Sequence, residues 1–207
     1  MLTKCYFIQS GATAMHTNLG QYIQNLVSAS GLSQSEISRE IKIPRQLLCY
    51  IIGGKREMSL QVAMKLESFF SLPDGTLMKM QAMQAVKQRK QHIRNHLCEL
   101  LVAKNAFWSF EVKSFDNIPD EELIEKCFTV LDMEDIDLMF EIFSRKRIQQ
   151  IWREKMAIQG EYMQMLNTMI AMYYFGIKDP EKYLARAERQ HINNLLKNST
   201  HETGINS

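Results

Sequence analysis

The residues best suited to specific chemistry gather in one stretch, PRQLLCYIIGGKR, which spans residues 44–56. If it forms a helix whose leucine and isoleucine side chains turn inward, four side chains face outward together: Arg45, Gln46, Cys49 and Tyr50. A guanidinium pairs with O6 and N7 of guanine, and a carboxamide pairs with N6 and N7 of adenine. Each such contact is worth about 1–3 kcal/mol of discrimination. We therefore expect these four residues to contact base edges in the major groove of DNA.

Two basic residues close the same stretch. Lys55 and Arg56 follow the pair Gly53-Gly54, and Pro44 stands at the beginning of the stretch. Groups beside a helix that enters a groove bind the phosphate backbone, which gives affinity and register but no choice of sequence. Lys55, Arg56 and Pro44 are therefore expected at the DNA backbone.

Helical periodicity indicates how these residues would be positioned. Capping and helix-breaking residues divide residues 19–101 into five predicted helices. These signals are Gly31, the capping box Ser33-Gln34-Ser35-Glu36, Pro44 in the first turn of the third helix, Gly53-Gly54, Ser59 and Pro73-Asp74-Gly75. Apolar residues recur on one face of each helix, and a short turn at Lys42-Ile43 joins the second helix to the third.

The stretch LSQSEISREIKIPRQLLCYIIGGKR resembles the Cro/repressor-type (XRE) helix-turn-helix family. The match includes the Ser-Gln opening of the second helix, apolar residues at 37, 41, 43, 48 and 51, and the closing Gly-Lys-Arg. With the following SLQVAMKLESFFSLPDGTLMKMQ it is most similar to the HigA-like antitoxin branch, over about residues 19–89. The resemblance implies that the third helix enters the major groove and that the Gln34 amide bonds a phosphate. In a twofold dimer, half-sites would lie about 34–36 Å apart.

Two positions depart from that family. Lys42 stands where the family usually has glycine, and a left-handed backbone there costs about 1–2 kcal/mol. Pro44 replaces the usual capping hydroxyl, so the start of the third helix can differ. Leu47 either touches a thymine methyl group or a partner, or belongs to the core, and contact is the favoured interpretation.

The second half of the chain is acidic and rich in aromatic residues and methionine. Four aromatic residues are expected to anchor its core: Phe107, Trp108, Phe110 and Phe115. Further helices are predicted from Pro119 onward and over MEDIDLMFEIFS, RKRIQQIWREKM and EYMQMLNTMIAMYYFGI. In the last of these, four residues are expected to face inward: Leu166, Met169, Ile170 and Tyr173.

Residues 106–184 are similar to an uncharacterised helical domain that is usually encoded beside nucleotidyltransferase-type toxins of the abortive-infection class. The similarity rests on FWSF, IPDEELIEK, DIDLMFEIFSRKRIQQIWRE and YFGIKDPEKYL. It implies an antitoxin-like role and supplies no catalytic residues.

Charge is divided unevenly along the chain. The net charge is +2, but residues 19–94 hold eleven Lys or Arg against five Asp or Glu, whereas residues 95–207 hold thirteen against eighteen. The first part can therefore be attracted to phosphate while the second part repels it. Within the first part, the basic run Lys87, Arg89, Lys90 and Arg94 either adds phosphate contacts or forms a solvated helix face, and we prefer the second interpretation.

Cysteine usage and hydropathy indicate a cytoplasmic protein. Cys5, Cys49, Cys98 and Cys127 are far apart and form no C-x-x-C pair, which favours reduced, buried or half-buried thiols. The first residues make a poor signal peptide, and no apolar run approaches the length of a membrane span.

Two groups of residues could suggest an enzyme or a metal site. Asp135 and Asp137 resemble a carboxylate pair that holds Mg²⁺, but no phosphate-binding loop precedes them. His92 and His96 have the i, i+4 spacing of zinc ligands but no third ligand pattern. We therefore predict no enzymatic activity, no metal and no cofactor.

The sequence thus predicts an all-α protein: a five-helix repressor-like helix-turn-helix domain followed by a C-terminal helical domain. The predicted segments are a flexible leader (1–17, with Met15 as an alternative start), the DNA-binding domain (18–90), a helical connector (91–105), the C-terminal domain (106–195) and a flexible tail (196–207). The predicted function is binding of operator double-stranded DNA by a homodimeric, antitoxin-type repressor of its own operon. The alternative is a protein-interaction module whose C-terminal domain neutralises a toxin encoded beside it, with DNA binding secondary.

Overall fold

The computed structural model describes residues 18–107 and 114–202, and within these ranges every regular element is helical. The prediction of an all-α fold is therefore confirmed. The chain forms two compact units, unit 1 (Met1–Arg89) and unit 2 (Lys90–Ser207). No helix in the described ranges is long and apolar enough to cross a membrane. The leader over residues 1–17, Trp108 and Phe110 lie outside the described residues.

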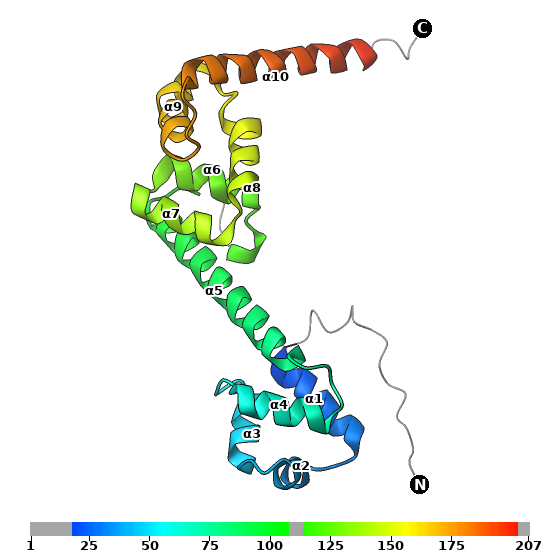
Figure 1. Ribbon diagram of the computed structural model, residues 1–207. Helices are drawn as coiled ribbons and strands as arrows, with labels where there is room; N and C mark the ends of the chain where they lie inside the picture. The colour runs from blue at the N-terminus through cyan, green and yellow to red at the C-terminus, as the bar shows by residue number, and fades with distance from the viewer. Residues whose placement is uncertain (1–17, 108–113, 203–207) are drawn as a thin grey trace. The chain divides into compact units, whose positions relative to one another are not determined.

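Unit 1 contains four helices and the first part of a fifth (Figure 1). They are α1 (Leu19–Ser30), α2 (Gln34–Glu40), α3 (Arg45–Ile52), α4 (Leu60–Phe69) and α5 (Thr76–Ala103). Gly31 ends α1 with a left-handed φ of 70°. The predicted capping box is present, because Ser33 N donates to the Glu36 carboxylate (2.7 Å) and Glu36 N donates to Ser33 Oγ (3.3 Å). Hydrogen bonding to the Glu36 carboxyl from the Ser33 backbone N–H, and from the Ser33 side chain, holds the pKa of Glu36 below its ordinary value.

The core of unit 1 is built from the apolar faces of these helices. Its buried members are Leu19, Ile23, Val27, Ile37, Ile41, Leu48, Ile51, Met58, Val62, Ala63, Leu66 and Leu77. Helix α3 packs on both α1 and α2. A Cβ on Gly20 would lie 2.0 Å from the Ile52 carbonyl oxygen, so only glycine allows α1 to pass this close to the end of α3.

Helix α5 is held in unit 1 by polar as well as apolar contacts. The Glu67 carboxylate is buried and accepts hydrogen bonds from Gly75 N (2.9 Å) and Leu77 N (2.7 Å) at the beginning of α5. Farther along the helix, Gln81 accepts from the backbone N–H of Met58 (2.8 Å). The side chain of Gln84 likewise accepts from Leu19 N (3.0 Å).

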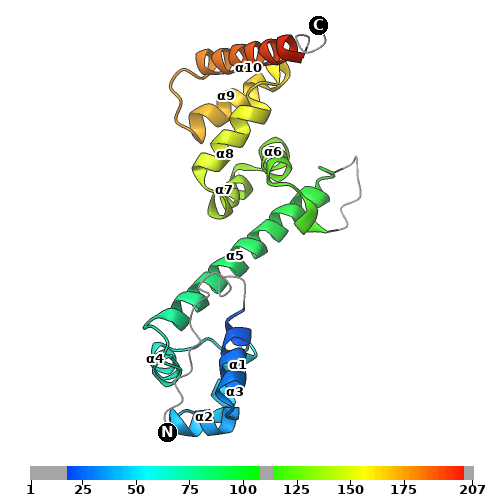
Figure 2. The same ribbon diagram turned by 90° about the vertical axis from the view of Figure 1, so that its right-hand side faces the viewer.

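Unit 2 contains the rest of α5 and five further α-helices (Figure 2). These are α6 (Asp120–Val130), α7 (Met133–Ile142), α8 (Arg145–Ile151), α9 (Gln164–Tyr173) and α10 (Pro180–Glu202). Four residues of α5 belong to its core: Ile93, Leu97, Cys98 and Leu101. The predicted connector over 91–105 is therefore part of the core of unit 2. Phe107 is buried in this core, and Phe115 packs against it.

Three features of unit 2 differ from the sequence-based expectation. Helix α8 ends at Ile151 and continues as a π-helical turn, Trp152–Met156, instead of running on as one α-helix. Helix α10 continues to Glu202, so residues 196–202, predicted as part of a tail, are helical. Met169 and Tyr173 were predicted to face inward, but both side chains are exposed, so this prediction is wrong.

Candidate nucleic-acid interface

The turn before α3 gives this helix its direction. Lys42 has a left-handed φ of 52°, the conformation anticipated at this position. The turn is held from both sides, because Ile43 N donates to Ser38 O (2.9 Å) and Lys65 Nζ donates to Lys42 O (3.2 Å). Pro44 is the N-cap residue of α3 rather than part of its first turn, and it makes no side-chain capping bond.

The predicted base-contacting residues lie together on the exposed face of α3. Arg45, Gln46, Cys49 and Tyr50 are all exposed. On the opposite face of the helix, Leu48 and Ile51 are buried in the core of unit 1. The spacing of the four exposed residues therefore produces one continuous polar face.

Within this face one internal hydrogen bond has a consequence for recognition. Gln46 Nε2 donates to Tyr50 Oη over 2.7 Å. The carboxamide nitrogen has two N–H donors, so Gln46 can keep its bond to Tyr50 while its second N–H donates to N7 of an adenine. The sequence spacing indicated that both residues share a face, but not that they are bonded.

The predicted phosphate-contacting residues are arranged around α3. Lys55 and Arg56 are exposed just after Gly54, whose φ is 66°. Pro44 is exposed, whereas Gln34 is half-buried. Gln34 Nε2 donates to Gln24 Oε1 (3.0 Å), so its amide is already bonded in the free protein.

Leu47 contacts the core of unit 1, whereas contact with DNA or a partner was the favoured interpretation. Its side chain is half-buried and packs against the core of unit 1. This packing supports the alternative interpretation, core packing, and contact with a thymine methyl group or a partner stays a prediction.

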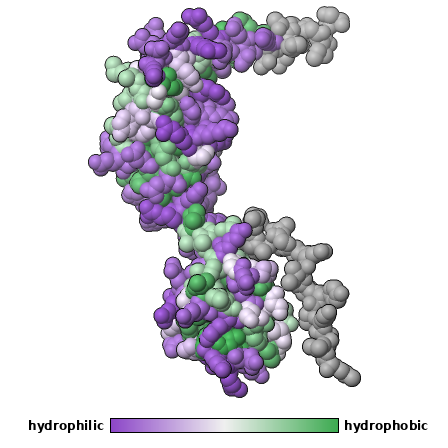
Figure 3. Space-filling view, viewed as in Figure 1, coloured by the Kyte–Doolittle hydropathy of each residue, from purple (hydrophilic) through white to green (hydrophobic). Residues whose placement is uncertain are grey.

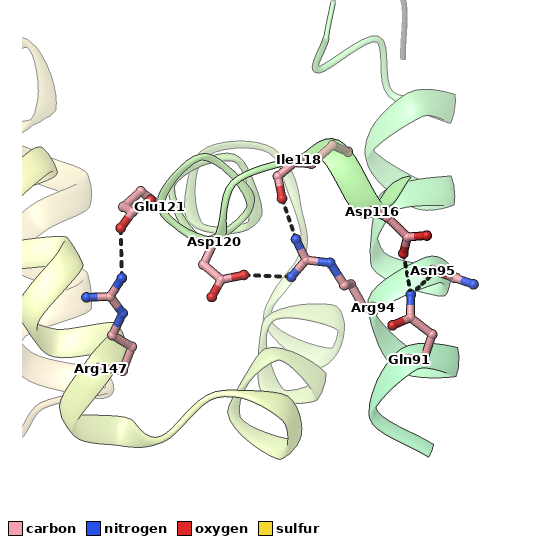
Figure 4. A network of polar contacts seen from close by, with 8 residues as sticks. All are labelled: Gln91, Arg94, Asn95, Asp116, Ile118, Asp120, Glu121 and Arg147. Atoms are coloured by element: carbon pink, nitrogen blue, oxygen red, sulfur yellow. Dashed lines mark hydrogen bonds and ion pairs between the residues drawn. The ribbon is translucent and has the colours of Figure 1, made fainter. Parts of the chain in front are cut away.

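The basic run on α5 does not act as a unit. Arg94 is bound within unit 2, where Nη1 lies 2.8 Å from Asp120 Oδ1 and Nη2 donates to the Ile118 carbonyl (Figure 4). Lys87 and Lys90, by contrast, are exposed. Phosphate binding is therefore not expected of Arg94.

Neighbouring polar contacts join other elements of unit 2. Gln91 Nε2 donates to Asp116 Oδ1 (3.0 Å), and Arg147 pairs with Glu121 (2.7 Å), as Figure 4 shows. The carboxylates of Asp116 and Glu121 thus accept from side chains of α5 and α8. The sequence did not indicate these pairings, because they join residues about 25 positions apart.

The residues that suggested metal chemistry do not form a cluster. Asp135 is half-buried and Asp137 is exposed on α7, and His92 and His96 are exposed on α5. In the part of the chain that the structure describes, no group of three His, Cys, Asp or Glu could hold a metal ion.

The described cysteines are free thiols in two different environments. Cys98 and Cys127 are buried, and burial raises the pKa of Cys98 to about 11 and that of Cys127 to about 12. Cys49 is exposed on α3 among the candidate base-contacting residues. Thiol reactivity at neutral pH is thus expected at Cys49 rather than at the two buried positions.

Comparisons of the chain with models of protein families, with curated proteins and with solved structures found no match. The resemblances to the repressor and abortive-infection families therefore stay predictions from the residues themselves. The geometry of α3 and its surroundings is the basis for a functional proposal.

Proposed function

We propose that unit 1 binds double-stranded DNA by inserting α3 into the major groove. The observation that carries this proposal is the exposed polar face of Arg45, Gln46, Cys49 and Tyr50 on a helix whose other face is buried. The width of the major groove admits an α-helix, and its base edges can be distinguished by hydrogen bonds. Arg45 and Gln46 supply the two side-chain types that pair with guanine and adenine.

Affinity would come from the charged residues beside this face. Lys55 and Arg56 are exposed, and within the described residues neither forms an ion pair with a carboxylate. Their charge is therefore available to phosphate oxygens, with Gln34 and Pro44 nearby along the backbone of the DNA. Such contacts release counterions and weaken as salt rises.

The biological role proposed is that of an operator-binding, antitoxin-type repressor of its own operon, acting as a twofold dimer. This role follows from the resemblance to the HigA-like branch. Neutralisation of a neighbouring toxin by unit 2 is compatible with it and follows from the resemblance of the second half.

The proposal is tested by selecting bound sequences from random duplexes and measuring their affinity by fluorescence anisotropy. Arg45→Ala or Gln46→Ala should each cost about 1–3 kcal/mol on the selected duplex and relax the preference at one base position. Lys55→Ala should weaken all duplexes alike and reduce the salt slope by about one. Lys126→Ala, which removes a charge from unit 2, is the matched control.

Two results would reject the proposal. One is the absence of duplex binding at low salt. The other is unchanged affinity and base preference in both the Arg45 and Gln46 variants, since these residues carry the discrimination.

A further inference from the structure

Helix α9 presents an apolar face that its own unit leaves uncovered. Its exposed members are Met165, Met169, Met172 and Tyr173, and the exposed Tyr162 lies on the 3-10 turn just before it, Gly160–Met163. These five residues are called the α9 face. Tyr162 is 93% exposed and Met165 is 88% exposed. The other side of the helix supplies Ile170 to the core of unit 2. Within α9, steps of three and four residues align Met165, Met169, Met172 and Tyr173 along successive turns.

The α9 face carries no charge. Residues 162–176 contain no Asp, Glu, Lys, Arg or His, in a chain of which 23% is charged. At the average composition of the chain, about three charged residues would be expected in such a stretch, and a solvated helix face normally has its share. Exposed methionine and tyrosine without charged neighbours are typical of a surface that another apolar surface covers.

Helix α10, which packs on α9, carries further exposed apolar side chains. A Cβ on Gly160 would lie 3.7 Å from Glu188 Oε1, so the middle of α10 passes the chain just before α9. One and two turns beyond Glu188, the side chains of Ile192 and Leu195 are exposed. Figures 1 and 2 show the second half of α10 extending past α9. No helix of unit 2 in the described ranges therefore covers this end of α10.

The size of the combined surface matches a stable interface. Large aromatic side chains bury about 150–250 Å² each. The partly exposed side chains of the α9 face, with Ile192 and Leu195, therefore offer on the order of 600–800 Å². This exceeds the typical largest apolar patch of a monomer, about 300–600 Å², and approaches the roughly 800 Å² that each partner contributes to a standard interface. In Figure 3, apolar colour is visible over the region of unit 2 where Figure 1 places α9.

We propose that the α9 face, with Ile192 and Leu195, is the interface through which two copies of this chain form a twofold dimer. A twofold axis sets the same patch against itself, so an uncharged apolar patch is self-complementary. Because the α9 face contains no charged side chain, the second copy does not have to supply opposite charges there. The nearest acidic residue in the sequence is the exposed Glu161, which directly precedes Tyr162. The inference locates the dimer of the proposed function but does not depend on DNA binding.

The test measures the mass of the full chain without DNA, by sedimentation equilibrium between about 1 and 100 µM. The wild type should approach twice 24.1 kDa as concentration rises. The double variant Met165→Glu/Met172→Glu places two charges in the interface and should weaken the dimer at least about 100-fold, because an unpaired buried charge is strongly unfavourable. Both positions are exposed in the isolated chain, so the helical circular dichroism should not change.

Met133→Glu is the matched control, because Met133 is 40% exposed on α7, outside the patch. This variant should remain dimeric. A wild type that stays monomeric throughout, including one whose α9 face binds a different protein, overturns the proposal. So does a double variant that dimerises as well as the wild type. A dimer that fails to bind DNA rejects only the proposed function, and Arg45→Ala should leave the mass unchanged.

Discussion

The folded structure gives Glu67 and Cys49 specific environments that their sequence neighbours do not indicate. Glu67 follows a buried leucine on α4, and its carboxylate accepts from two backbone N–H groups at the start of α5. Cys49 lies on the exposed face of α3, whereas Cys98 and Cys127 are enclosed in unit 2. Each difference leads to a measurement on a single residue.

Replacement of Glu67 should destabilise unit 1. Glu67→Ala leaves the N–H groups of Gly75 and Leu77 without their acceptor and should lower the free energy of unfolding by about 3 kcal/mol. Glu67→Gln keeps one acceptor oxygen and should cost less. Urea denaturation of the full chain measures both, with the exposed Glu57→Ala as a control that should change stability by less than about 0.5 kcal/mol. Equal stability of Glu67→Ala and Glu57→Ala would contradict the role assigned to this carboxylate.

Alkylation should distinguish the cysteines. Their raised pKa values of about 11 and about 12 leave almost no thiolate on Cys98 and Cys127 at pH 8, and both are enclosed. Iodoacetamide at that pH should therefore modify Cys49 before Cys98 and Cys127, as followed by peptide mass spectrometry. The selected DNA duplex should slow this reaction if α3 lies in the groove. Equal labelling of Cys49 with and without bound duplex would place the DNA elsewhere.

At the scale of elements, the caps of unit 1 are where sequence and structure agree best. The Ser33 capping box, Gly31 and Ser59 act within a few residues of their own position, so the local pattern contains the information. The exposed face of α3 follows from the same periodicity. In contrast, the hydrogen bonds of Glu67 with the start of α5, and of Gln46 with Tyr50, depend on the direction in which each side chain points. Helical periodicity does not specify that direction. The packing of Leu47 against the core likewise depends on neighbouring helices.

One buried amide on α9 bonds to the π-helical turn after α8, and helical periodicity does not reveal this contact. Asn167 on α9 accepts from Trp152 Nε1 (2.8 Å) and donates to the Met156 carbonyl (2.8 Å), and it is buried. The sequence predicted a single helix through Met156. It could not show that Asn167, fifteen residues after Trp152, bonds to this turn in the folded chain.

Asn167→Ala should therefore destabilise unit 2. It leaves the Trp152 indole N–H and the Met156 carbonyl buried without partners, which should cost about 2–4 kcal/mol in the free energy of unfolding. Urea denaturation followed by tryptophan fluorescence measures this loss. Asn193→Ala on the exposed side of α10 is the control and should have little effect. A wild-type midpoint for Asn167→Ala would show that the turn does not need this amide.

At the scale of the whole molecule, the two proposals assign different tasks to the two units. Unit 1 would supply contacts to one half-site, and unit 2 would join two copies. Met169 and Tyr173 illustrate why the sequence could not separate these roles. Their helical spacing is the same whether they face their own core or a second copy, and only the packing of α9 distinguishes the two.

The two tasks can be separated with one variant. Met165→Glu/Met172→Glu should bind an isolated half-site as well as the wild type does, because α3 is unchanged. A wild-type dimer binds both half-sites of one duplex at once and so gains affinity. On such a duplex the variant should bind more weakly than the wild type, on the order of 10²-fold or more. Anisotropy titrations on both duplexes measure this. Equal loss on the single half-site would mean that the substitutions disturb unit 1 directly.

Helix α5 supplies Leu77 to one core and Ile93 and Leu101 to the other without a break in its backbone. A fragment that stops at Arg89 would end in mid-helix, with its last carbonyls unsatisfied. A fragment that starts at Lys90 would begin without a capping residue, with its first N–H groups unsatisfied. Either cut frays a helix on which a core depends. The two units therefore share the single helix α5. Insertions or fusions are expected to be better tolerated in the loops of the protein than near Arg89 and Lys90, within this helix.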